Sequence, residues 1–181
     1  MTTSRIRPIE TAYGGFQFRS RLEARWAVFF DALDLKYLYE PQGFEVDGRR
    51  YLPDFCLLLG PMLWAEVKPA YDADPDGVKR WRSFVEARGE HGVLLTDMTN
   101  GPGPFTFIGP EPLHEGQYYQ EQAYWSACPT GYHFEPVPSC RFWICDRCET
   151  PEMAAYFSDE GIGHPKIAAA FDQARSHRFG R

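Results

Sequence analysis

The fold is decided by two short stretches, YLPDF at residues 51–55 and WAEVK at residues 64–68. Each joins charged residues to an apolar run of the kind that forms a buried strand. Gly60-Pro61 between them is a turn signal. We therefore expect strands over 50–58 and 63–68 that pair with each other as a hairpin.

Three charged side chains converge in this expected hairpin. Side chains alternate between the faces of a strand, so Glu66 and Lys68 project to the same side, and Asp54 lies near them on the neighbouring strand. Two adjacent carboxylates repel each other, and a divalent cation relieves that repulsion. Oxygen ligands suit magnesium or manganese, which can activate a bound water and neutralise charge on a phosphate. The alternative is an ordinary cross-strand charge pair on a solvated face.

Helical and strand patterns on either side complete the expected core. Residues 18–34 have the apolar spacing of an amphipathic helix, and Ser20 followed by Glu23 matches a capping box. A second helix is expected over 75–88. The stretch 100–112 is rich in glycine and proline, which indicates a linker. Further apolar runs predict strands at 36–40, 43–46 and 93–95, and a last helix at 165–177.

These elements predict an α/β fold in which a helix, an antiparallel meander, a second helix and a strand surround a small sheet. We expect the core to span residues 13–100, a metal-binding module residues 113–160, and a C-terminal helix with a basic tail residues 164–181. No apolar run reaches the roughly 18 residues of a membrane span, and no secretory signal is recognisable. The expected location is the cytoplasm.

Four of the five cysteines cluster in the second half of the chain. In a reducing cytosol such clustering is more typical of a metal site than of disulfide bonds. Cys145 and Cys148 have the spacing of a zinc knuckle, and Cys128 with His133 would complete a tetrahedral, zinc-ribbon-like site. Cys140 competes with His133 for the fourth place. The alternative is a small aromatic core that contains reduced cysteines.

The net charge of −6 is unevenly distributed along the chain. Residues 1–30 hold five arginines against two acids, and the tail 164–181 is basic as well. The stretch 108–160 between them holds nine acids. An acidic protein with this distribution can still have a local phosphate-binding face. Solvated surface charge is the alternative.

Four sequence blocks together resemble the PD-(D/E)xK nuclease superfamily: FRSRLEARWA (18–27), YEP (39–41), YLPDF (51–55) and WAEVK (64–68). The resemblance covers about residues 13–97 and is strongest to small nuclease-like proteins of bacteriophages and actinobacteria. It implies a restriction-endonuclease-like core that hydrolyses phosphodiester bonds in DNA with the help of a divalent metal.

The resemblance also implies a role for each charged residue. Asp54 and Glu66 would bind Mg²⁺ or Mn²⁺, the backbone carbonyl of Val67 would complete the metal shell, and Lys68 would act on the attacking water. Glu23 on the first helix would join the site. Its alternative role is the capping box alone.

Arg19, Arg21 and Arg25 surround Glu23 and suit forked contacts with phosphate oxygens, although solubilising charge explains each of them equally well. DNA is the expected partner, and the acidic zinc module is a candidate surface for a protein partner or a structural brace. The alternative function is a catalytically silent module, phage- or defence-related, that binds nucleic acid or protein. The sequence leaves open whether the substrate is DNA or RNA and whether two copies pair as a homodimer.

Overall fold

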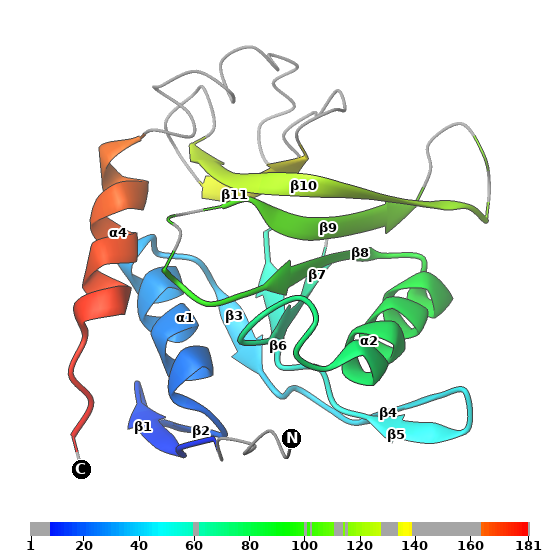
Figure 1. Cartoon of the computed structure of the whole chain (residues 1–181), viewed down its shortest axis with the longest axis horizontal. Helices are drawn as coiled ribbons and strands as arrows, with labels where there is room; N and C mark the ends of the chain where they lie inside the picture. Colours follow the sequence, from blue (N-terminus) through cyan, green and yellow to red (C-terminus); the bar gives the residue numbers. More distant parts are fainter. Residues whose placement is uncertain are drawn as a thin grey trace, which may run out of the picture.

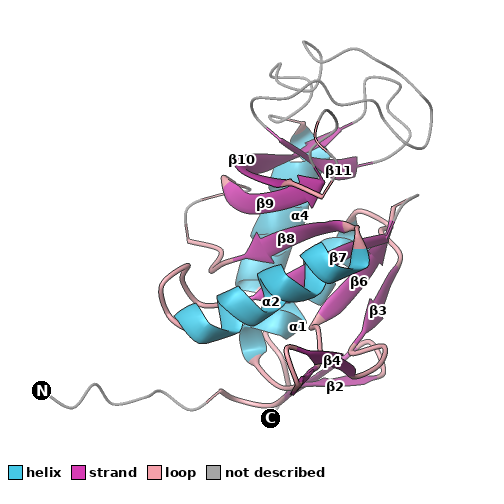
Figure 2. Ribbon diagram, turned by 90° about the vertical axis from the view of Figure 1, so that its right-hand side faces the viewer, coloured by secondary structure: helices cyan, strands magenta, loops and turns pink. Residues whose placement is uncertain are grey.

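The computed structural model describes residues 8–59, 62–99, 101, 103–110, 114, 116–127, 134–138 and 164–180. Within these residues the chain is an α/β protein with a mixed seven-stranded sheet between helices (Figures 1 and 2). Helices α1 (Arg21–Ala32) and α4 (Pro165–Ser176) pack on one face, and α2 (Pro75–Arg88) packs on the other. The expected α/β class is confirmed. None of the described helices is long and apolar enough to cross a membrane.

The seven-stranded sheet has the order β11-β10-β9-β8-β7-β6-β3, and β7–β8 is the one parallel pair among the described strands. Helix α2 makes the crossover that a parallel pair requires. The strands are β3 (Tyr37–Tyr39), β6 (Phe55–Leu58), β7 (Met62–Val67), β8 (His91–Leu95), β9 (Phe105–Pro110), β10 (Tyr118–Ala127) and β11 (Phe134–Pro138).

Alternation along the strands divides the interior into two apolar cores. Ala65 of β7 belongs to the core beneath α1 and α4, whereas the neighbouring Trp64 packs against Phe84 of α2. Glu66 lies two residues beyond Trp64, so its side chain emerges on the same face as Trp64. The strand pattern therefore puts this carboxylate on the side of the sheet that α2 covers.

Helix α1 is stabilised by a cap at its N-terminus and by packing against α4. At its start, the Ser20 hydroxyl accepts a hydrogen bond from the Glu23 N–H at 3.1 Å, which confirms the expected cap. Along its length, α4 packs beside it, and the ring of Phe171 lies 6.2 Å from Trp26 and 6.0 Å from Phe29. Because Phe171 is buried in this contact, α4 is part of the core rather than an appendage.

Two small hairpins lie beside the main sheet (Figure 1). Strand β4 (Phe44–Val46) pairs with β5 (Arg49–Tyr51), and the two residues between them, Asp47 and Gly48, have φ angles of 49° and 71°. These left-handed conformations suit a two-residue hairpin turn, for which an Asp-Gly sequence is favoured. The other hairpin pairs β1 (Thr11–Tyr13) with β2 (Phe16–Phe18).

The continuous strand expected over 50–58 is wrong. Strand β5 ends at Tyr51 and β6 begins at Phe55, and Pro53 in the break has no N–H with which to continue a ladder. Among the described strands, β4 and β5 pair only with each other, so the expected single meander is also wrong, and β3 pairs directly with β6. Asp54 is therefore the last residue of this break, immediately before β6.

The stretch 100–112 is more than the expected linker, because it contains β9, which pairs with both β8 and β10. Its Phe105 and Phe107 side chains are buried in the core under α1. Strand β10, inside the segment 113–160 expected as a separate module, continues the same sheet. Burial of the β9 rings outweighs the local glycine and proline signals.

Candidate active site

Asp54 lies in the interior beside the start of β6, with 3% of its surface exposed. Phe55 pairs with Ala65 across the β6–β7 hairpin, so Asp54 stands opposite Glu66, one residue beyond the last paired position. Its Oδ2 accepts the backbone N–H of Val67 at 2.8 Å, and its Oδ1 accepts the Arg19 guanidinium at 2.6 Å. The hairpin expected from the sequence therefore brings the two carboxylates side by side.

Glu66 is also buried, with 4% of its surface exposed, and each of its oxygens has a partner. The Tyr51 hydroxyl donates to Oε2 at 2.6 Å, and the Lys68 ammonium lies 2.8 Å from Oε1. Strand alternation thus places Glu66 and Lys68 on one side, as expected. The alternative of a solvated charge pair does not fit, because the Glu66 carboxylate is shielded from water.

Glu23 belongs to the helix cap and also lies near Asp54. Ser20 caps the helix and also donates its hydroxyl proton to Glu23 Oε1 at 2.7 Å. The other oxygen accepts the Tyr39 hydroxyl at 2.7 Å and the Arg19 backbone N–H at 3.1 Å. At 7% exposure, the Glu23 carboxylate faces the interior, where its charge acts on Asp54. Capping therefore does not remove Glu23 from the site.

Three buried carboxylates close together make the site strongly negative. Burial raises the pKa of Asp54 well above its ordinary value, and the charges of Glu66 and Glu23 raise it further. The Val67 N–H and Arg19 oppose this rise without cancelling it. The three carboxylates face two cationic side chains, Arg19 and Lys68, so a further cation would offset the remaining negative charge.

Lys68 is the cationic side chain next to Glu66. Burial alone would lower the pKa of Lys68, but the carboxylates of Glu66, Asp54 and Asp74 outweigh burial and raise it. Asp74, the N-cap residue of α2, lies 3.4 Å from the Lys68 ammonium. Helix α2 thus fixes the far side of the lysine, and Lys68 stays charged at neutral pH.

The donor chemistry of the site fits a hard divalent cation. Its acidic ligands are all carboxylate oxygens, which magnesium and manganese prefer. In this structure the described residues contain no group of three histidine, cysteine or acidic side chains at metal-binding separation. The oxygens of Asp54 and Glu66 instead have Arg19, Val67, Tyr51 and Lys68 as partners. The residues therefore fit a cation in kind, while protein donors occupy the oxygens that would bind it.

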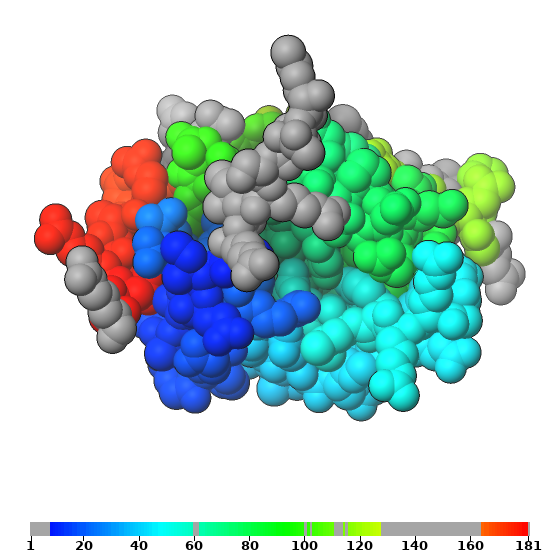
Figure 3. Space-filling model, turned by 60° about the horizontal axis from the view of Figure 1, so that its bottom comes forward, coloured from blue at the N-terminus to red at the C-terminus, as the bar shows by residue number. Residues whose placement is uncertain are grey.

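The three arginines near Glu23 have different surroundings. Arg19 reaches into the site, where it contacts Asp54 and also forms an ion pair with Glu40. Arg21 is exposed and Arg25 is half-buried. The surface between the N-terminal hairpin and α2 is hollowed when seen from the side of the small hairpins (Figure 3). Of the three residues expected to contact phosphate, Arg19 is held against a carboxylate of the site, Asp54.

Sequence reasoning missed four polar residues that support the site. Tyr39 and Glu40 belong to the YEP block and Tyr51 to the YLPDF block, but nothing local indicates that their side chains reach Glu23, Arg19 and Glu66. Their contacts depend on how β3 and β5 are placed in space. The fourth is Asp74, whose position before Pro75 is a recognisable helix start. The supporting residues are Tyr39, Glu40, Tyr51 and Asp74.

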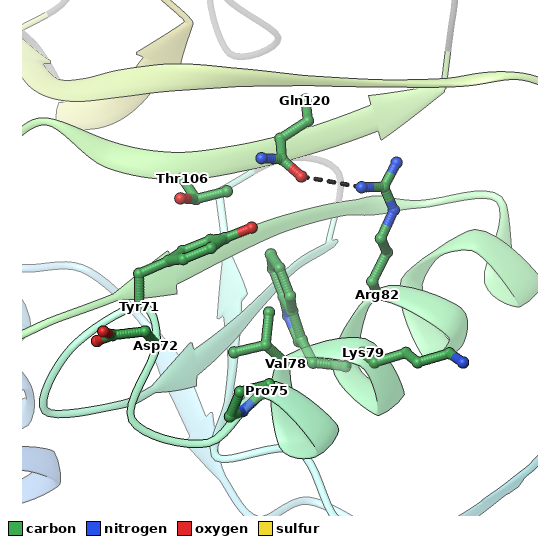
Figure 4. A pocket seen from close by; sticks show the side chains of 9 residues that line it. Tyr71, Asp72, Pro75, Val78, Lys79, Arg82, Thr106 and Gln120 are labelled. Atoms are coloured by element: carbon green, nitrogen blue, oxygen red, sulfur yellow. Dashed lines mark hydrogen bonds between the residues drawn. The ribbon is translucent and has the colours of Figure 1, made fainter.

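A pocket of about 320 Å³ adjoins the loop that leads from Lys68 to α2 (Figure 4). Tyr71 on this loop is 49% exposed and faces the pocket. On the opposite wall, Arg82 of α2 donates to the side-chain oxygen Oε1 of Gln120 at 2.9 Å. Thr106 of β9 also lines it. The pocket lies on the α2 side of the sheet, the side on which Glu66 emerges, so an extended ligand at the site has a neighbouring recess.

The cysteine cluster lies outside the described residues. Cys128, His133, Cys140, Cys145 and Cys148 all fall in this part, so the zinc site stays a prediction. Cys56, in contrast, is a buried free cysteine on β6, where it packs in the core under α2.

Comparison of the sequence with models of protein families gave no match, and the curated proteins and solved structures gave none either. The class of the protein therefore rests on its own features. The described residues define an α/β protein in which a β-hairpin and a helix bury three carboxylates beside a lysine and an arginine.

Proposed function

We propose that this chain is a metal-dependent nuclease with a restriction-endonuclease-like core, which hydrolyses phosphodiester bonds in DNA. The observation that carries the proposal is the position of Asp54 opposite Glu66, one residue beyond the last pair of the β6–β7 hairpin, with Lys68 2.8 Å from Glu66. Burying such charges is costly, so a fold that retains them in its interior uses them for chemistry more often than for stability.

Each residue has a distinct task in this proposal. Asp54 and Glu66 would hold Mg²⁺ or Mn²⁺ together with the backbone carbonyl of Val67. When bound, such a cation neutralises charge on the phosphate and lowers the pKa of a water. Lys68 stays charged and lies at the edge of the carboxylates, so it would orient that water or stabilise the developing negative charge. Glu23 adds a third carboxylate and positions Arg19 through the Arg19 backbone N–H.

A cleavage assay tests the nuclease. Purified protein is incubated with supercoiled plasmid, linear duplex and single-stranded DNA in Mg²⁺, Mn²⁺ or EDTA. We expect metal-dependent cleavage that falls by roughly 10²-fold or more in Lys68→Ala, as for loss of a key charged group. Glu45→Gln on exposed β4 is the matched control and should retain activity. If the folded wild type cleaves none of these DNAs with either metal, the nuclease is ruled out for them.

A second function is a catalytically silent module that binds nucleic acid or protein. One observation favours it, namely that protein donors already satisfy every oxygen of Asp54 and Glu66. A titration with Mn²⁺ separates the two functions. The nuclease requires a bound metal that is lost in Asp54→Asn, whereas the silent module requires none.

The proposal also includes the zinc module. Cys128, Cys145 and Cys148 would bind structural Zn²⁺ with His133 or Cys140 as the fourth ligand. Metal analysis of the purified protein tests this directly. We expect zinc in a one-to-one ratio with the chain, lost after replacement of Cys145 and Cys148, while a zinc-free protein would contradict the module.

A further inference from the structure

Arg19 is the cationic side chain that contacts Asp54. Its guanidinium bridges two carboxylates, with Nη2 2.6 Å from Asp54 Oδ1 and Nε paired with Glu40. Its backbone N–H is anchored separately, because it donates to the Tyr39 hydroxyl oxygen at 2.9 Å and to Glu23. The backbone of Arg19 is therefore fixed beside the site, while its guanidinium lies between Asp54 and Glu40.

The two oxygens of Asp54 differ in how easily they change partner. Oδ2 accepts the N–H of Val67, which belongs to the backbone of a central strand and cannot move away. Oδ1 is held by Arg19, whose side chain is 54% exposed. Because this side chain reaches water, its guanidinium can be hydrated again when another cation takes its place on the buried Asp54 carboxylate, which must stay paired. Oδ1 is therefore the oxygen of Asp54 that can accept a different cation.

We propose that Arg19 is the resident cation of this site and that it leaves Asp54 when a divalent metal binds. This inference rests on the proposed function. The guanidinium and a metal ion both need Oδ1, so the two contacts exclude one another. Glu40 keeps the released guanidinium at the edge of the site, where it can meet a phosphate of the substrate. Arg19 thus couples metal binding to the availability of a phosphate contact.

Competition of this kind lowers the apparent metal affinity of the wild type, because only molecules with a free Oδ1 bind metal. Replacing Arg19 by a neutral residue removes the competitor. We expect Arg19→Gln to bind Mn²⁺ at least about threefold more tightly than the wild type, because the variant has no guanidinium to displace from Asp54. Arg21→Gln on the same segment is the matched control, since it removes the same charge from an exposed position.

The affinities are measured by titration calorimetry, or by electron paramagnetic resonance of free Mn²⁺, without DNA. Tighter binding in Arg19→Gln and unchanged binding in Arg21→Gln would support the exchange. Equal affinity in wild type and Arg19→Gln would overturn it and leave the nuclease standing, as would weaker binding in Arg19→Gln. An equal gain in affinity in Arg21→Gln would also overturn it, because the gain would then follow from the loss of any nearby positive charge. Absence of Mn²⁺ binding in all three proteins would overturn both proposals.

DNA binding gives a second readout. In Ca²⁺, which also takes carboxylate oxygen ligands, the released Arg19 should add a phosphate contact. We expect Arg19→Gln to weaken DNA affinity in Ca²⁺ and to leave it unchanged in EDTA, where Arg19 stays on Asp54. An equal loss in both conditions would contradict the exchange. Circular dichroism verifies that both variants are folded.

Discussion

At the scale of single residues, the buried carboxylates of the site lower the stability of the fold around them. Asp54, Glu66 and Glu23 are buried within one cluster, and the pKa of Asp54 is raised by burial and then by its acidic neighbours. The hydroxyls of Tyr39 and Tyr51 and the cations Arg19 and Lys68 offset part of this cost. Residues arranged for stability alone would not accumulate like charges here.

This conflict predicts a pH-dependent gain in stability for Asp54→Asn. The folded-state pKa of Asp54 lies above its unfolded value, so the protonated carboxyl contributes stability that is fully present below the unfolded pKa and lost as pH rises through the folded pKa. Asparagine stays neutral at every pH. We expect the variant to have a higher free energy of unfolding than the wild type at about pH 8, and the difference to vanish below about pH 4.

Urea denaturation across this pH range measures the difference. Asp47→Asn is the control, because Asp47 is exposed and asparagine tolerates its positive φ. A variant that is less stable than the wild type at high pH would show that the pairing of Asp54 with Arg19 and Val67 outweighs its burial.

At the scale of secondary-structure elements, Asp74 at the start of α2 has two roles. Asp74 accepts the Gly77 N–H at 3.1 Å as the helix cap and also faces Lys68. Partial burial opposes ionisation, but the Gly77 N–H and Lys68 hold the pKa of Asp74 below its ordinary value. One residue thus connects the stability of a helix to the position of a site lysine.

Two substitutions at Asp74 separate its role as helix cap from its contact with Lys68. Serine can still cap the helix, whereas alanine cannot, and both remove the charge facing Lys68. We expect Asp74→Ala to lower the free energy of unfolding by about 0.5–2 kcal/mol and Asp74→Ser to lower it by only a few tenths. Chemical denaturation at neutral pH measures both. If serine is as damaging as alanine, the contact with Lys68 matters more than the cap.

At the scale of the whole molecule, distant segments of the chain meet around one sheet (Figure 1). Helix α4, close to the C-terminal end of the sequence, packs on α1, which carries Glu23. Strands β9 and β10 extend the sheet beyond β8. The site is therefore supported by residues from far outside the stretch that carries its charges.

Loss of the α4 contact should destabilise the entire fold. Phe171 is 3% exposed and touches Trp26 and Phe29, so Phe171→Ala leaves a cavity in the core. We expect a loss of about 3–5 kcal/mol in the free energy of unfolding, seen as one shifted transition in urea. The neighbouring exposed Asp172→Ala should change it by about 0.5 kcal/mol or less. A small effect of Phe171→Ala would mean that α4 is a detachable appendage.

The sequence by itself determined the features that depend on near neighbours. Helix 75–88 was predicted with the bounds that the structure shows. Both ends have local causes, since Pro75 is a favoured first residue and Gly89 adopts the left-handed conformation that ends a helix. The turn at Asp47-Gly48 follows from the same local rules. The approach of Asp54 to Glu66 and Lys68 needed only strand alternation and one hairpin.

Only the tertiary structure decided the rest, because it depends on which distant segments pair and which side chains they bury. Local patterns could not show that β4 and β5 leave the sheet, or that β9 joins it through its buried aromatic rings. Nor could they show that Arg19 turns inward to Asp54, since its direction is set by charges that β3 and β6 bring together. Sequence neighbours define the charged residues of this site, and long-range packing defines the partners that hold them.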